Sequence, residues 1–249
     1  MLRGVRVIKV GGGEIEDPAW LDRFAAGVAQ ARPAVIVHGG GRRISAWQER
    51  LGLPVVMRDG IRVTTPEVAE LVQMVLCGPI RTALVRALRS QGVDAVGVAG
   101  GDGCLTVELQ DPDRLGQVGR VTSVDRAFLS RLLERGITPV LAPVSVSPDG
   151  MAVNVNADDA AAAVANGLDA AELLFVSDIP GVMCGTERLA AVTRADLDDL
   201  IERGVVHGGM VAKLKAALAA GHGPTRIGDV SMLTDPSRGT VIAAVGAAA

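Results

Sequence analysis

The fold is decided by residues 5–13, which read Val-Arg-Val-Ile-Lys-Val-Gly-Gly-Gly. The β-branched residues predict a buried strand, and the three glycines predict a loop whose bare N–H groups can approach an anion. A strand of a parallel sheet is normally apolar on both faces. Lys9, near the carboxyl end of this strand, is therefore better explained by a ligand in the crevice than by solvent. The alternative is the first strand of any α/β fold, followed by a flexible turn.

The same pattern recurs at residues 33–41, where Pro-Ala-Val-Ile-Val leads into His-Gly-Gly-Gly. An Asp17-Pro18 start predicts a helix to about residue 31 between the two strands. In a parallel sheet both glycine loops fall at the same edge, so we expect them to line one crevice. No P-loop motif occurs and no Gly-x-Gly-x-x-Gly follows the first strand, which excludes the P-loop and dinucleotide-binding readings.

The remaining pattern alternates strands and helices, as in an α/β fold with a mainly parallel sheet. Further strands are expected at residues 95–99, 138–144, 172–176, 227–229, 232–234 and 240–243. Helices are expected at residues 44–51, 66–90, 125–135, 158–166, 196–203 and 210–220. Residues 55–64 predict a lid hairpin with an Asp-Gly turn, and residues 105–121 predict a second hairpin. Gly78-Pro79 should kink the long helix, whose apolar surface suits a subunit contact.

Composition limits the class of protein. The chain has 249 residues, 49% of them hydrophobic, which is enough for one large α/β unit or two lobes that share a sheet. The net charge is −3 and the sequence has no basic run, which argues against a nucleic-acid-binding protein. Three widely spaced cysteines and three scattered histidines predict neither a disulfide framework nor a metal site. Without a signal-peptide pattern or an uninterrupted membrane-length apolar run, we expect a cytoplasmic protein with no membrane partner.

Two further motifs carry charge to the crevice. Residues 154–159 read Asn-Val-Asn-Ala-Asp-Asp, and alternation places both asparagines on one side, with Asp158 at a helix start. The plain alternative is a helix N-cap formed by Asn156. Residues 208–213 read Gly-Gly-Met-Val-Ala-Lys, so Lys213 lies one turn past paired glycines, although a lone lysine is usually solvated.

Two single residues add to these motifs. Arg62 lies on the predicted lid hairpin, where it could hold a carboxylate or be a solvated strand residue. His38 could act as a base, although a histidine beside glycines at a strand end is more often structural.

Together these motifs resemble the amino-acid kinase family, and the resemblance covers nearly the whole chain. It is carried by seven stretches in the family's order: residues 8–12, 37–41, 51–55, 59–64, 154–158, 177–181 and 208–213. The resemblance implies an open three-layer αβα sandwich with a mainly parallel central sheet. It also implies an N-terminal lobe (1–145) for the acyl-amino-acid substrate and dimer contacts, and a C-terminal lobe (146–249) for ATP.

The implied reaction is ATP-dependent phosphorylation of the γ-carboxylate of N-acetyl-L-glutamate, in arginine biosynthesis, with Mg²⁺ held mainly by phosphates and water. The transferring phosphoryl group would be neutralised by two lysines that one aspartate holds: Lys9, Lys213 and Asp158. Backbone N–H donors would come from Gly11, Gly12, Gly40 and Gly41. The α-carboxylate of the substrate would be held by Arg62 and Asn154, with support from Asn156. The nucleotide would be bordered by Asp178, Gly209 and Met210.

The chain also departs from the family. Arg42-Arg43 is more basic than usual, Glu14 replaces an apolar or amide residue, and residues 221–242 look short on the adenine side. Family members inhibited by arginine carry an additional N-terminal helix and form hexamers, so we expect an arginine-insensitive homodimer joined through residues 66–89. Two other functions stay open. One is a sister kinase for carrier-linked aminoadipate or glutamate, and the other is a non-catalytic relative, although such a relative would be expected to lose a lysine or the aspartate.

Overall fold

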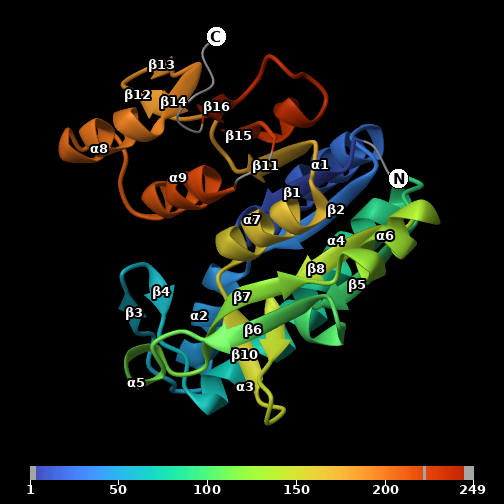
Figure 1. Ribbon diagram of the computed structural model, residues 1–249, viewed down its shortest axis with the longest axis vertical. Helices are drawn as coiled ribbons and strands as arrows, with labels where there is room; N and C mark the ends of the chain where they lie inside the picture. The colour runs from blue at the N-terminus through green and yellow to red at the C-terminus, as the bar shows by residue number, and fades with distance from the viewer. Residues whose placement is uncertain (1–3, 221–222, 244–249) are drawn as a thin grey trace.

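An eight-stranded sheet forms the centre of the structure, a computed structural model that describes residues 4–220 and 223–243. Its strands lie in the order β14-β16-β15-β11-β1-β2-β8-β5 (Figure 1). Their bounds are β1 Arg6–Val10, β2 Ala34–His38, β5 Ala95–Ala99, β8 Thr138–Ala142, β11 Glu172–Val176, β14 Ala191–Thr193, β15 Thr225–Gly228 and β16 Thr240–Ala243. The run from β15 to β5 is parallel, and β16 pairs antiparallel with β15. The expected mainly parallel sheet is confirmed.

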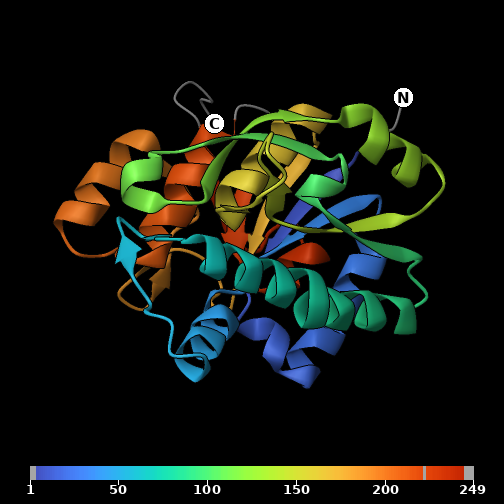
Figure 2. The ribbon, with the colours of Figure 1, turned by 90° about the horizontal axis from the view of Figure 1, so that it is seen from below.

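Helices cover both faces of this sheet. The α-helices of the described residues are α1 Pro18–Gln30, α2 Gly41–Arg50, α3 Pro66–Val75, α4 Arg81–Ser90, α5 Pro112–Leu115, α6 Arg126–Glu134, α7 Ala157–Leu168, α8 Arg194–Glu202 and α9 Gly209–Ala219, of which α5 belongs to the second sheet described below. Figure 2 shows the α3–α4 run (teal to green) on one side of the sheet and α7 (yellow) on the other. The resulting three layers are the αβα sandwich that the sequence predicted.

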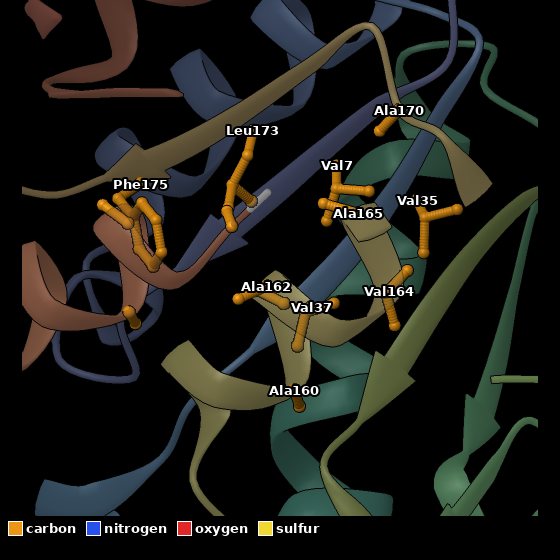
Figure 3. Packing of buried hydrophobic residues seen from close by; sticks show 14 of the residues in the cluster. Val7, Val35, Val37, Ala160, Ala162, Val164, Ala165, Ala170, Leu173 and Phe175 are labelled. Atoms are coloured by element: carbon orange, nitrogen blue, oxygen red, sulfur yellow. The ribbon is translucent and has the colours of Figure 1, made fainter. Parts of the chain in front are cut away.

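The alternation of side chains along β1 decides which layer Lys9 faces. Val7 packs in the cluster that contains the α7 alanines, whereas Ile8 and Val10 pack in the cluster that contains α1. Figure 3 shows Val7, Val35 and Val37 beside Ala160 and Ala165 of α7. Because successive residues of a strand point to opposite faces, Lys9 lies on the same face as Val7, below the start of α7.

A second sheet stands beside the first, in the order β6-β7-β10-β9. Its strands are β6 Leu105–Leu109, β7 Val118–Val124, β9 Val144–Val146 and β10 Ala152–Val155. The predicted hairpin is confirmed as the antiparallel β6–β7 pair, although α5 lies between its strands. β10 pairs parallel with β7, and this pairing places the Asn154 motif at the start of α7.

The predicted lid hairpin is confirmed, with short strands β3 (Met57–Arg58) and β4 (Ile61–Arg62). Two small features were not foreseen: β14, and a hairpin of β12 (Met183–Cys184) with β13 (Glu187–Arg188).

The long helix is broken where expected, by a π-helical segment at Leu76–Ile80 in which Gly78 leaves helical geometry. Among the described residues, the run Pro66–Ser90 is long and apolar enough to cross a membrane by length and composition alone. This is weak evidence, because core helices pass the same test. The run packs on β10, α1, β5 and β8, as a core helix does.

Two predicted strands are wrong. Residues 232–234 form the end and the C-cap of a 3₁₀ helix, η4 (Val230–Leu233), because the Asp229 carboxylate accepts a hydrogen bond from the Ser231 N–H at 2.9 Å and caps the turn. Residues 138–144 form two strands, because Pro143 has no N–H to donate to a ladder and separates β8 from β9.

Candidate active site

A cleft of about 350 Å³ opens at the carboxyl ends of β1 and β2. It is lined by both glycine loops, the lid hairpin, residues 154–158 and Lys213. The sequence predicted that two glycine loops at one sheet edge would share a crevice, and the structure confirms it.

The two loops touch, and this contact requires glycine. A Cβ on Gly12 would lie 2.6 Å from the backbone nitrogen of Gly40, and a Cβ on Gly40 would lie 2.5 Å from side-chain atoms of Leu76 and Ile80. The Gly39 N–H donates to the Val10 carbonyl at 2.9 Å, which joins the second loop to the first strand. Backbone N–H groups from both chain segments therefore line one small space, the arrangement that binds phosphate.

Lys9 and Asp158 form a buried ion pair at the floor of the cleft. The Nζ atom of Lys9 lies 2.6 Å from Oδ1 of Asp158, and the two residues are 5% and 9% exposed. Asp158 is held at the first turn of α7, where Asn156 is the N-cap and accepts hydrogen bonds from the N–H groups of Asp158 (2.8 Å) and Asp159 (3.3 Å). A charged pair at this depth is a costly arrangement that suits a site better than a core.

Lys213 lines the same cleft from α9, a helix about 200 residues after Lys9 in the sequence. Burial and the nearby Lys9 ammonium lower the pKa of Lys213 from its ordinary value of 10.5, while the carboxylates of Asp158, Glu14 and Asp178 act in the opposite direction. Both lysines line the cleft, and their ammonium groups repel each other. A position between them is favourable for an anion.

Arg62 is buried and also lines the cleft. Its guanidinium donates to the Gln48 side-chain oxygen, to the Gly41 carbonyl at 3.0 Å and to Ser45 Oγ at 2.9 Å. Burial lowers its pKa. No acidic side chain of the described residues pairs with it, so a buried positive charge lines the cleft without a protein anion. The sequence had left a solvated strand residue open, and the burial of Arg62 excludes that reading.

The two asparagines line the cleft in different ways. The side-chain amide of Asn154 donates to Thr64 Oγ1 at 3.2 Å, which joins the second sheet to the segment after the lid hairpin. Asn156 caps α7, so its plain structural reading is confirmed, and it lines the cleft as well.

The residues expected around the nucleotide are not part of this cleft. Asp178 follows β11 and lines a second hollow of about 600 Å³, together with Asp229 and Ser231. Gly209 and Met210 open α9, one turn before Lys213. The structure brings together the residues predicted to hold the phosphoryl group and the substrate. Asp178, Gly209 and Met210 do not line the cleft, although a Cβ on Gly209 would lie 3.8 Å from Nζ of Lys213, which does.

His38 is fully buried and does not line the cleft, so it has no access to a substrate there. Its Nδ1 atom lies 3.2 Å from the Gly39 carbonyl, and burial lowers its pKa to about 4. The structural reading of this histidine is supported.

His38 should make the protein less stable in acid. As the pH falls from 7 to 5, the unfolded chain binds a proton at its ordinary pKa of 6.5, whereas the folded chain binds it only near 4. The stability contributed by neutral His38 is therefore lost in this window, by about 2 kcal/mol. Urea unfolding at pH 7 and pH 5 gives the decrease in the free energy of unfolding between the two pH values. This decrease should be smaller in His38→Gln than in the wild type by about 2 kcal/mol. Equal drops in the two proteins would contradict the prediction.

Sequence reasoning missed the residues that position Arg62. Ser45 and Gln48 lie on α2 at helical spacing from Gly41, and all three contact the guanidinium. This spacing was the available signal. Arg42, which the sequence marks only as part of an unusually basic pair, is exposed and also lines the cleft beside Gly13.

The chain is similar to known proteins over most of its length. The sequence profile described as the amino acid kinase family matches residues 4–228. An acetylglutamate kinase of Chloroflexus aurantiacus is 48% identical over 221 residues, covering 87% of each chain. One of Roseiflexus castenholzii is 40% identical over 245 residues, covering 96% of this chain and 94% of that protein.

Among solved structures, the protein smu.665 of Streptococcus mutans superimposes with a TM-score of 0.83 at 32% identity, covering 96% of this chain and 98% of that one. The matched region contains every residue of the cleft described above. The chain belongs to the amino acid kinase family.

Proposed function

We propose that this protein is an acetylglutamate kinase, which transfers the γ-phosphoryl group of ATP to the γ-carboxylate of N-acetyl-L-glutamate. The observation that carries the proposal is the meeting of Lys9, Lys213 and Asp158 in one cleft with two glycine loops. Arg62 lines the same cleft, is buried and pairs with no acidic side chain of the described residues. It can therefore bind the α-carboxylate of such a substrate. Relatives that carry this name at 48% and 40% identity support the choice of substrate.

The residues of the cleft would act by position and charge. A carboxylate and a phosphate chain repel each other, and phosphoryl transfer needs mainly alignment and neutralisation around the moving group. Lys9 and Lys213 supply the positive charge, and Asp158 fixes Lys9 at 2.6 Å. The N–H groups of Gly11, Gly12, Gly40 and Gly41 donate to phosphoryl and carboxylate oxygens. None of these groups has to reorganise as charge moves, which is what lowers the barrier.

The chemistry of the cleft suits ATP that carries Mg²⁺. When bound, the cation would neutralise charge on the phosphates. Mg²⁺ in kinases takes phosphate oxygens, water and one or two carboxylates, and the cleft lining holds two carboxylates, Glu14 and Asp158. Asp158 is engaged by Lys9, and Glu14 has a buried oxygen with no hydrogen-bond partner. The donor set therefore fits such a cation.

The two lobes would divide the work. Residues 1–145 would bind the acyl amino acid, and residues 146–249 would bind ATP, with Asp178, Gly209 and Met210 along the nucleotide. The Asp178 carboxylate acts to raise the pKa of Lys213, and this electrostatic interaction supports a position of Asp178 near the phosphates. A kinase of this pathway would work in the cytoplasm, where ATP is available.

Measurement of ADP release with a panel of acceptors tests the function. N-acetyl-L-glutamate is expected to support turnover, while glutamate, aspartate and carbamate are not. Turnover only with a carrier-linked aminoadipate or glutamate would replace the substrate named here. No turnover with any acceptor would indicate a non-catalytic relative.

Replacing Arg62 should weaken acyl-substrate binding. Arg62→Ala is expected to raise the KM for N-acetylglutamate ~10- to 100-fold, because a charge-assisted hydrogen bond is lost. The KM for ATP should change little. The matched control is Arg58→Ala, which removes an exposed arginine from the same hairpin and should leave both constants near wild type. A proportionate rise in both KM values for Arg62→Ala would contradict this role.

The protein is proposed to be a homodimer joined through residues 66–89. The α3–α4 run leaves Met74 60% exposed, and the neighbouring β5 is an edge strand with Val96 37% exposed. Apolar side chains on a long helix and an open sheet edge suit a second copy of the chain. Light scattering should give about twice the 25.6 kDa chain mass. A hexameric mass would contradict the prediction.

A further inference from the structure

Glu14 places a negative charge in a cleft that otherwise suits anions. It begins the 3₁₀ turn η1 (Glu14–Glu16), directly after the first glycine loop. Its carboxylate folds back over Gly11, where Oε2 occupies the space that a Cβ on that glycine would need. The same side chain lines the cleft with Lys9 and Lys213, and its charge opposes the lowering of the Lys213 pKa that burial and Lys9 cause.

No structural role explains this carboxylate. Its Oε2 atom is buried without a hydrogen-bond partner, and within residues 4–220 and 223–243 the Glu14 side chain forms no ion pair. The helix that follows is capped by Asp17, whose carboxylate accepts from the Ala19 N–H at 2.9 Å. Glu16, two residues further on, is exposed and does not line the cleft. A buried, unpaired carboxylate oxygen is costly, so a partner is expected from outside the chain.

The partner cannot be a phosphate, because two anions would repel each other. We propose that Glu14 contributes a carboxylate oxygen to the divalent cation that accompanies the nucleotide phosphates, either directly or through a cation-bound water. This inference rests on the proposed kinase function and assigns one residue of the same cleft. Oxygen is the donor that Mg²⁺ prefers, and carboxylates join substrate phosphates around this ion in other phosphoryl-transfer sites. Asp158, the other carboxylate of the cleft, is already paired with Lys9.

The test is a binding cycle that needs no turnover. Isothermal titration gives the Kd of ADP with Mg²⁺ and with EDTA, for the wild-type protein, Glu14→Gln and Glu16→Gln. In the wild type, Mg²⁺ should tighten ADP binding. The gain is the ratio of the Kd of ADP with EDTA to its Kd with Mg²⁺. In Glu14→Gln this ratio should be ~10- to 100-fold smaller than in the wild type, as expected for loss of a ligand or outer-shell group. Metal-free ADP should bind the variant as tightly as the wild type or more tightly, because a repulsive charge is removed.

The control, Glu16→Gln, removes the same charge from the same turn and should keep the wild-type gain. Glu14→Asp keeps a carboxylate on a shorter arm and should lie between the two, which also serves if Glu14→Gln folds poorly. An unchanged gain in Glu14→Gln and Glu14→Asp would overturn the inference. So would equal tightening with and without Mg²⁺, which would make Glu14 only a repulsive charge. Because no acyl substrate is present, an error in the proposed substrate leaves this result unaffected.

Discussion

Lys213→Ala should lower kcat ~10²- to 10³-fold and leave the fold intact. Loss of one well-placed donor to a developing charge costs about 3–4 kcal/mol of barrier. Lys213 is half-buried on α9, and its pKa is lowered by burial and by Lys9, so its charge is held close to the reaction centre. Steady-state kinetics with N-acetylglutamate and ATP measure the loss, which should affect kcat and kcat/KM alike.

Lys215 provides the control for this loss. It lies two residues further along the same helix and is exposed, so Lys215→Ala should keep wild-type kinetics. A far-ultraviolet circular dichroism spectrum would show whether each variant keeps its helices. Near-wild-type kcat in a folded Lys213→Ala protein would refute the role of this lysine.

Lys9→Met should damage both catalysis and stability. The substitution removes a charge from the phosphate site and leaves Asp158 buried without its partner at 2.6 Å. An uncompensated buried charge costs about 3–5 kcal/mol, so the free energy of unfolding should fall by that amount while kcat falls by orders of magnitude. Urea denaturation and steady-state kinetics measure the two effects separately.

A double variant separates the two roles of the pair. Lys9→Met with Asp158→Asn removes both charges, so most of the lost stability should return, because the desolvation cost disappears with the pair. The kcat should stay low, because the Lys9 ammonium that would neutralise the phosphoryl group is still missing. If Lys9→Met unfolds at the wild-type urea concentration, the pair contributes nothing to the fold and the buried-charge argument is wrong.

The parts of the site that the sequence predicted follow from local rules and parallel-sheet geometry. A lysine in an apolar strand, glycines after two neighbouring strands and a capped acidic helix start can each be read within about ten residues. Parallel pairing then places them at one edge, and the period of two in β1 turns Lys9 toward α7.

The parts that were wrong or missing depend on distant contacts. The second sheet joins β7 to β10 in parallel, and no local pattern encodes that pairing. The burial of Arg62 depends on three groups of α2, which lie 14 to 21 residues earlier in the chain. At residues 232–234 the apolar Met-Leu pair resembles a short strand, but the local cap formed by Asp229 starts a 3₁₀ turn instead.

The break between α3 and α4 has a consequence for how this sequence can change. Leu76 and Ile80 lie against the bare backbone of Gly40, so the interruption in the helix supports the second glycine loop of the cleft, more than thirty-five residues earlier in the chain. A methyl group at position 40 would lie 2.5 Å from the ends of both the Leu76 and the Ile80 side chains, so both side chains would have to shift or lose volume. Substitutions at positions 76 and 80 of the long helix are therefore coupled to substitutions at position 40 of the glycine loop.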